Sequence, residues 1–290
     1  MNAASMENSG FEFSATYRNR DHAFKYDISA NLSTLKNKVT SLGIGKDSYI
    51  SGAYATYVGQ EIGQFYGWVY EGIARTQADL DNHATQQGVN VGDCLYKDIS
   101  GPEGTPDGVI DAYDQTVLGS GLPKVNFGLS THMEYKGFDL NISTYGVLNY
   151  HVSDDIYNSL NSCYGYGNKE VGMLDANRWS EDGTYLSSVP RTYAANNATL
   201  PWNDLFSSRK IQNAAYWKIA NVELGYNFPD KWFGGYVNGV RLYVSAQNLY
   251  TFTGYHGYNV DYAGGTFTPG YNFCSFPSAR TFMCGLHFTF

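Results

Sequence analysis

The sequence is poor in charged residues and contains no long apolar run. Asp, Glu, Lys and Arg make up 16% of the 290 residues, against roughly 25% in ordinary globular proteins. No stretch approaches the ~20 apolar residues of a membrane-spanning helix, and residues 1–10 lack the basic and apolar segments of a signal peptide. The net charge of −8, with scattered basic residues, argues against a nucleic-acid partner because nothing would replace the counterions on phosphates.

Catalytic and metal motifs are also absent. The four cysteines form no CxxC arrangement, so zinc is not expected and no disulfide pairing can be inferred. The six histidines form no HExxH, and there is no GxSxG or GxGxxG. The sequence therefore predicts no enzyme and no certain cofactor. A glycosidase pair, either Glu61 with Glu71 or Asp182 with Asp204, ranks low because sequence gives no separation for it.

What the sequence does contain is aromatic residues, glycine and alternation. Aromatic residues make up 16% of the chain, and there are 32 glycines, which favours strands and turns. In the last ten residues, TFMCGLHFTF, every second residue is apolar, and a strand places such residues on one face. The same alternation predicts seven strands, at 11–18, 24–32, 125–135, 138–150, 215–228, 241–252 and 282–290.

These segments are longer than the ~5–6 residues of ordinary strands and suit a tilted membrane crossing of ~9–11 residues. Small and charged residues share the second face, which a packed sandwich core would not accept. We therefore predict an all-β, antiparallel transmembrane β-barrel segment with long outer loops. Short turns near 19–21, 136–137 and 229–240 would face the periplasm, and loops at ~34–123, ~153–212 and ~256–278 would face outward. Since single-chain bacterial barrels have an even number of strands, seven predicts a part of a larger barrel.

The ordered motifs of the chain resemble the carboxy-terminal part of SusC/RagA-type TonB-linked outer-membrane proteins. The resemblance covers nearly the whole sequence. It rests on GQEIGQFYGWVYEGI (59–73), GDCLYKDISG with DGVIDAYDQTVLGSGLPKVNFGL (92–129), YKGFDLNIS (135–143), NRWSED (177–182), WKIANVELGYNFP (217–229), RLYVSAQNLYTFTGY (241–255) and Phe290.

The resemblance implies a 22-stranded barrel with an internal plug in the outer membrane of a gram-negative cell. Its implied partners are a SusD-type surface lipoprotein, the TonB complex, outer-membrane lipid and the barrel-assembly machinery, which would read the terminal Phe290. Residues 1–290 lack the plug, the TonB-contact segment and the signal peptide of that family. We therefore expect the chain to be the carboxy-terminal part of a longer receptor, with Met1 internal to the full frame.

One acidic loop resembles a calcium-binding loop. Without the insertion 102–106, twelve positions run from residue 98 to 114, with Gly108 at the turn. The candidate oxygen ligands are Asp98, Ser100, Asp107, the Val109 carbonyl, Asp111 and Asp114. The final Asp in place of Glu and the insertion both depart from the pattern. The alternative is an outer loop whose carboxylates cap backbone amides.

Tryptophans in the second outer loop are candidate ligand contacts. Trp179 and Trp202 could stack on sugar rings, although packing within the loop explains them equally well. For Tyr66, Trp68 and Tyr70, interleaved with glycines, packing is favoured.

Three functions remain open from sequence. The first is part of a TonB-dependent importer of oligosaccharides or peptides that works with a SusD-type lipoprotein. The second is a secreted or surface β-rich glycan-binding module, and the third, lower-ranked, is a β-sheet glycoside hydrolase. A requirement for detergent would indicate the first of these.

Overall fold

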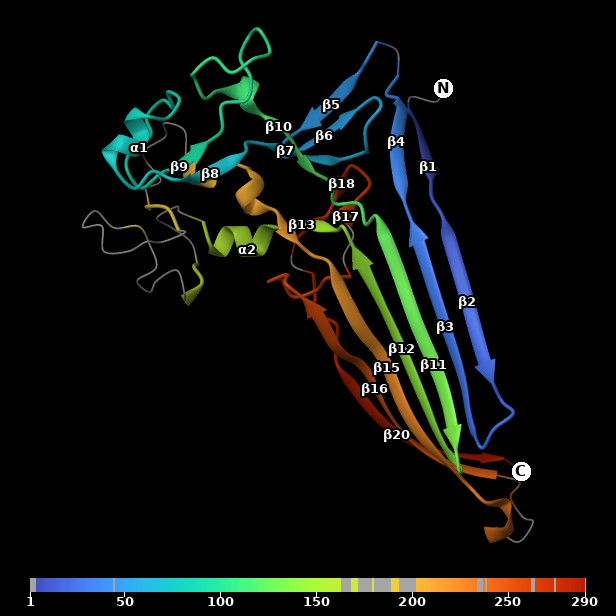
Figure 1. Ribbon diagram of the computed structural model, residues 1–290. Coiled ribbons are helices and arrows are strands. Elements are labelled where there is room, and N and C mark those ends of the chain that lie inside the picture. Colours follow the sequence, from blue (N-terminus) through green and yellow to red (C-terminus); the bar gives the residue numbers. More distant parts are fainter. Residues whose placement is uncertain are drawn as a thin grey trace.

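A long seven-stranded antiparallel sheet forms the body of the protein, and its loops gather at one end (Figure 1). The structure is a computed structural model that describes residues 4–43, 45–162, 168–171, 179, 189–192, 202–233, 237, 239–261, 264–273 and 275–289. The sheet consists, in spatial order, of β2 (Glu12–Asn19), β3 (Phe24–Thr34), β11 (Val125–Tyr135), β12 (Phe138–Leu148), β15 (Tyr216–Phe228), β16 (Gly239–Thr253) and β20 (Thr281–Thr289). The seven predicted strands are confirmed, and each pairs with the next one along the chain.

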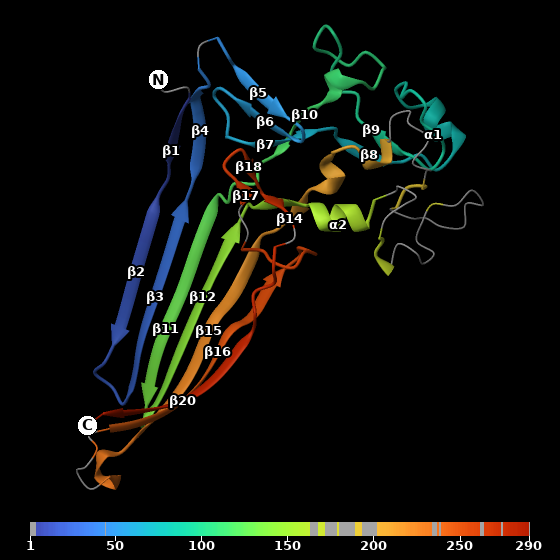
Figure 2. The same cartoon turned by 180° about the vertical axis from the view of Figure 1, so that it is seen from behind.

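Short connections lie at one end of the sheet and long ones at the other (Figure 2). The tightest turn joins β11 to β12 through Lys136 (φ 48°) and Gly137 (φ 88°); two successive positive φ angles match the twist of a hairpin. The connections 35–124, 149–215 and 254–280 leave from the opposite end. We call these the turn end and the loop end; they are the ends at which the sequence predicts periplasmic turns and outer loops.

One face of the sheet is apolar although it is exposed. Across β12, β15 and β16 the paired side chains on this face are Leu140, Leu224 and Val244. At the sheet edges the exposed fractions reach 62% for Phe13 and 70% for Phe282. An extended apolar surface of this kind needs a lipid or protein partner. Its alternation with a polar face is the pattern of a barrel wall in lipid.

Aromatic rings border this apolar face at both ends. Near the turn end, the Phe138 and Tyr226 ring centroids are 4.7 Å apart. Near the loop end, Trp217 stacks on Phe252 at 5.2 Å. β12 rises about 33 Å over its ten residue steps at ~3.3 Å each, enough to cross a ~25 Å apolar band at the usual barrel tilt. The two aromatic borders therefore lie where the two membrane interfaces would.

A bulge keeps the alternation on the correct face. The pairing register of β15 slips between Ile219 and Asn221 against both neighbouring strands. In the sequence, apolar residues occupy odd positions at Trp217 and Ile219 but even positions from Val222 onward. The extra residue, Ala220, restores parity, so that all of these side chains share the apolar face. Lys218 consequently points to the opposite, polar face, which we call the inner face.

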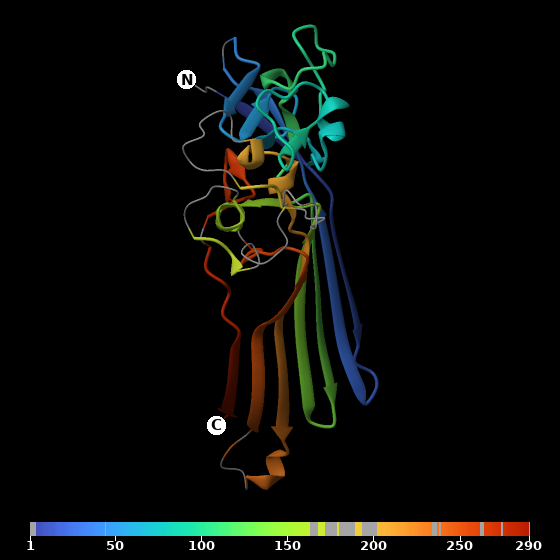
Figure 3. The same ribbon diagram turned by 90° about the vertical axis from the view of Figure 1, so that its left-hand side faces the viewer.

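Smaller sheets and helices make up the loop end (Figure 3). β1 (Ser5–Ser9) pairs with β4 (Lys36–Ser41), and β8 (Tyr70–Ile73) pairs with β9 (Cys94–Tyr96). A four-stranded sheet contains β5 (Ser48–Ser51), β6 (Tyr54–Tyr57), β7 (Gln64–Gly67) and β10 (Thr116–Gly119). The other strands and the α-helices are β13 (His151–Asp154), β14 (Gln212–Asn213), β17 (Gly264–Gly265), β18 (Thr268–Pro269), β19 (Tyr271–Asn272), α1 (Gln77–Asp81) and α2 (Asp155–Leu160). Short 3-10 helices span Ala112–Asp114, Trp202–Asp204, Ser208–Lys210 and, at the turn end, Asp230–Trp232. In the described part of the chain, no helix has the length and apolar character needed to cross a membrane.

Candidate functional site at the loop end

The connection between β16 and β20 folds back over the inner face of the sheet. We call residues 254–280 the inner strap. Tyr255 and Val260 of the strap form one buried apolar cluster with Val147 and Tyr216, two inner-face residues of β12 and β15. The inner face at this end is therefore covered by the strap, whereas the outer, apolar face is left bare.

An ion pair fastens the strap to the wall. The Lys218 side chain, only 4% exposed, donates from Nζ to Asp261 Oδ2 at 2.5 Å. The Tyr145 hydroxyl donates to Asp261 Oδ1 at 3.2 Å. A buried lysine without a partner would be costly, so Asp261 both neutralises Lys218 and holds the strap in place.

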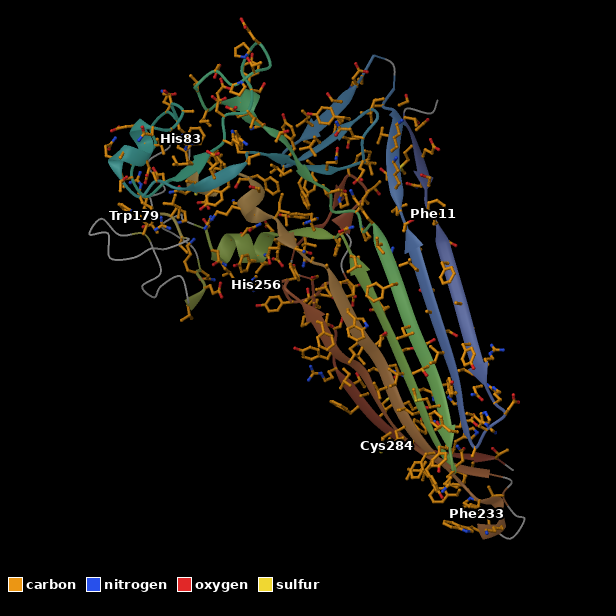
Figure 4. The ribbon with its side chains drawn as sticks, in the orientation of Figure 1. Phe11, His83, Trp179, Phe233, His256 and Cys284 are labelled. Atoms are coloured by element: carbon orange, nitrogen blue, oxygen red, sulfur yellow. The ribbon has the colours of Figure 1, made fainter. Side chains whose placement is uncertain are left out.

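A second buried group joins the strap to the neighbouring loop. The Tyr255 hydroxyl donates to Asp154 Oδ2 and accepts from Asn272 Nδ2 at 2.7 Å. The other Asp154 oxygen accepts from the Tyr157 amide at 2.9 Å, capping α2. Burial, and then the bond to Asp154, raise the pKa of Tyr255. The labelled His256 marks the start of the strap beside these groups in Figure 4.

Close backbone approaches complete the attachment of the strap. β19 runs parallel to β13, and the Ser153 amide donates to the Gly270 carbonyl at 2.8 Å. Gly270 has φ 75°, and a Cβ there would lie 2.4 Å from the His151 carbonyl oxygen. Only glycine fits this position, so any larger residue would push the strap off the wall.

A further buried group joins the first outer loop to the second. Arg191 donates from Nε to Asp93 Oδ1 at 2.6 Å and from Nη2 to Oδ2 at 2.9 Å. Asn203 donates to the same carboxylate at 2.8 Å and accepts from the Cys94 amide at 2.7 Å. This group was missed from sequence, since nothing local pairs residues about a hundred positions apart.

The acidic loop 98–114 uses its carboxylates as backbone caps. Asp114 is fully buried; its Oδ1 accepts from the Ile99 amide at 2.8 Å and the Ser100 amide at 3.1 Å, and its Oδ2 accepts from the Asp111 amide at 2.9 Å. Asp107 accepts from the Val109 amide two residues on. Within residues 98–114, all of them described, no three acidic or other ligand side chains are grouped for a metal.

This geometry favours the capping interpretation of the loop. The predicted oxygen ligands Asp98, Asp107, Asp111 and Asp114 each accept at least one backbone amide. One buried oxygen, Asp98 Oδ1, has no hydrogen-bond partner among the described residues. Of the oxygens in this loop, it is therefore the one most available to a cation. Calcium binding by this loop stays a prediction.

Replacement of Asp114 by Ala is expected to destabilise the loop by about 2–4 kcal/mol, because three backbone amides lose the buried carboxylate that accepts from them. The exposed Asp107 makes only a local turn bond, so Asp107→Ala is the matched control and should change little. Protection of residues 98–114 in hydrogen exchange measures both effects. A loss of protection on EDTA treatment as large as that of Asp114→Ala would show that calcium, rather than capping, holds the loop.

Trp202 lies in a packed core. It is 5% exposed, clusters with Cys94, Tyr96 and Ile110, and donates from Nε1 to the Gln87 carbonyl at 2.8 Å. Its position favours packing over sugar stacking.

Trp179 is half-buried against Gly92, where a Cβ would come within 2.5 Å of the indole (Figure 4). Trp68 and Tyr70 also pack against the Trp202 cluster, as predicted. Phe290, the predicted assembly signal, lies outside the described residues.

These features define a class of protein: a two-faced antiparallel wall with aromatic borders and long loops folded over one end, as in the barrels of TonB-dependent transporters. No protein-family model matches the chain. Solved structures of the RagAB peptide transporter align with 98% of this chain and 29% of theirs, with a TM-score of 0.76 at 21% identity. The fold is therefore that of a segment of an antiparallel transmembrane β-barrel.

Sequence comparison identifies the class more closely. TonB-dependent receptor P3 of Formosa agariphila is 30% identical over 308 aligned residues, which include the whole of this chain and 29% of the receptor. TonB-dependent receptor SusC of Bacteroides thetaiotaomicron is 26% identical, with 27% of its length covered. The resemblance to SusC/RagA-type TonB-dependent receptors is confirmed over the full chain, which spans under a third of the curated relatives it matches. Both of these relatives are named as TonB-dependent receptors.

Proposed function

We propose that the chain forms part of the wall and of the outer mouth of a TonB-dependent importer, which takes up oligosaccharides or peptides across a gram-negative outer membrane. The observation that carries the proposal is similarity to TonB-dependent receptors along the whole of this chain, together with a sheet that is apolar and bare on one face and covered by loops on the other. On this reading residues 1–290 correspond to the carboxy-terminal part of a larger barrel.

We infer different roles for the loop end and for the missing part of the receptor. The loop end would bind ligand in the space between the receptor and a SusD-type lipoprotein, with the three long connections as its surface. Energy for transport would come from TonB acting on a plug. The buried groups around Asp93, Asp154 and Asp261 keep the loops in one arrangement, which lowers the entropic cost of binding.

Disruption of the reading frame that contains this chain tests the proposal. Cells are expected to lose uptake of one ligand class, measured with fluorescent oligosaccharides and peptides, and a tonB deletion should cause the same loss. The protein should fractionate with outer membranes and need detergent for extraction. A product that is soluble without detergent and binds glycan alone would instead support the glycan-binding module.

Phe290 is proposed as the residue that the barrel-assembly machinery reads. Phe290→Ser is expected to lower the amount of folded receptor in the outer membrane severalfold, as measured by heat-modifiable migration on gels. Thr289→Ser, one residue earlier, is the matched control and should assemble normally. Equal assembly of both variants would remove this role from Phe290.

A further inference from the structure

A polar pocket lies between the inner strap and the wall. Its volume is about 340 Å³, and it is bounded by β15, β16 and both legs of the strap. That volume falls at the lower end of the ~300–1,000 Å³ range of small-molecule sites. The strand residues that line it lie in the loop-end parts of β15 and β16.

In the part of the chain that the structure describes, the lining of this pocket contains two basic side chains and no acidic one. Lys218 and Arg280 both line it. Lys218 is neutralised by Asp261, which is not among the residues that line the pocket. Among the described residues, Arg280 has no ion pair. In a chain with 27 acidic and 19 basic residues, a guanidinium without an ion pair, beside a lysine that is already paired and otherwise uncharged lining residues, indicates a site for an anionic group.

The rest of the lining has the chemistry of a sugar site. Hydroxyl and amide groups come from Thr251, Thr253, Ser278, Asn248 and Asn259. Asn248, Asn259 and Thr253 each already donate one bond to a backbone carbonyl, but a carboxamide keeps a second N–H and a hydroxyl keeps acceptor lone pairs, which can serve sugar hydroxyls. Tyr258 adds an aromatic ring that is 69% exposed, suited to the apolar face of a pyranose.

The two legs of the strap are held at this pocket by side-chain bonds. Asn259 donates to the Phe276 carbonyl at 3.1 Å, which joins the outgoing leg to the returning one. Asn248 of β16 donates to the Ala279 carbonyl at 2.9 Å, one residue before Arg280. The backbone that carries Arg280 is thus positioned before any ligand arrives.

We propose that this pocket binds the carboxylate of an acidic oligosaccharide, with Arg280 as its partner and the hydroxyl and amide groups around the sugar ring. The proposal rests on the import function above and narrows its substrate class to uronate-containing glycans. A guanidinium can accept a carboxylate through two parallel hydrogen bonds, which gives orientation as well as attraction.

Binding to the purified complete protein encoded by the frame that contains this chain tests the proposal. The probes for calorimetry are trigalacturonate, neutral maltotriose and trialanine, whose carboxylate comes from a peptide. Arg280→Gln is expected to raise the Kd for trigalacturonate about tenfold and to leave the Kd for maltotriose unchanged. The matched control is Arg18→Gln, which makes the same charge change in β2 at the turn end.

A second variant should act in the opposite direction. Asp261→Asn removes the charge that neutralises Lys218 but keeps a side-chain oxygen that can accept from Lys218 Nζ and so hold the strap. Trigalacturonate should therefore bind severalfold more tightly and with a steeper salt dependence. Structural damage would weaken binding in both variants, so opposite signs identify the electrostatic role.

Equal binding of trigalacturonate and maltotriose, or no effect of Arg280→Gln, would overturn the proposal, as would binding of trialanine alone. Uptake in cells is measured separately. Import of neutral glycans or peptides would leave the proposed function standing while the acidic-sugar site fails.

Discussion

Raising the pH above about 10 is expected to unfold the loop end before the sheet. Tyr54, Tyr96 and Tyr255 are each at least 92% buried in the loop region. Burial is the largest cause that raises the pKa of each phenol above its ordinary value of 10.0. Each therefore stays protonated in the folded protein at a pH where the unfolded chain would release its proton.

The sign and size of the effect follow from this difference. Below pH 10 both states hold the proton, and the contribution of these tyrosines to stability is complete. Above pH 10 the unfolded state loses a proton that the folded state keeps, so each tyrosine costs about 1.4 kcal/mol of stability per pH unit. Three such residues give a slope of about 4 kcal/mol per pH unit until the folded phenols ionise.

Near-ultraviolet circular dichroism of the loop end and far-ultraviolet dichroism of the sheet measure the two transitions. Tyr255→Phe should reduce the alkaline slope by about a third, although it also loses the bond to Asp154. Tyr258→Phe, at a ring 69% exposed, is the control and should leave the slope unchanged. A single transition that is insensitive to Tyr255→Phe would contradict the prediction.

The sheet could be predicted from sequence because its signal is local and repeated. Alternation places each of the seven strands without reference to the others, and the chain order of the strands is also their spatial order. The break in parity at Ala220 is visible in the sequence as well, since the apolar residues change from odd to even positions there. The register of a two-faced strand is strongly specified when one face must be apolar.

The loop end could not be predicted in the same way. Asp154 and Tyr255 lie 101 positions apart, and Asp93 and Arg191 lie 98 apart; no periodicity connects them. For the acidic loop, the same carboxylates suit either a cation or backbone amides. Only the structure shows that backbone amides donate to both carboxylate oxygens of Asp114. Trp202 likewise is a residue type that often contacts sugars, but it is buried like a core residue.

Replacement of Arg241 by Gln is expected to destabilise the wall by about 3 kcal/mol. On the inner face near the turn end, Arg241 donates from Nε to Asp139 Oδ2 at 2.9 Å and from Nη2 to Glu223 Oε1 at 2.7 Å. The Asp139 side chain is 6% exposed. Removing the cation leaves a buried carboxylate whose one remaining side-chain donor among the described residues is Asn227, 2.9 Å away. An uncompensated buried charge is strongly destabilising.

The backbone beneath the Arg241, Asp139 and Glu223 side chains explains why they can meet at this point of the sheet. Gly225 lies between Asp139 and Arg241, and a Cβ there would come within 2.5 Å of both side chains. The sheet thus leaves room for the guanidinium to reach across β15 and join three strands, β12, β15 and β16. Losing it should affect all three strands together rather than one pair.

Unfolding by urea in detergent, followed by tryptophan fluorescence, measures the effect of Arg241→Gln. Arg20→Gln is the matched control, because Arg20 also pairs with an aspartate, Asp27, but is 60% exposed, and exposed pairs contribute little. The double variant Asp139→Asn/Arg241→Gln should recover part of the loss, since it removes the unpaired charge. If Arg20→Gln and Arg241→Gln destabilised equally, or if the double variant recovered nothing, the loss would come from packing of the arginine stem instead of from the stranded carboxylate.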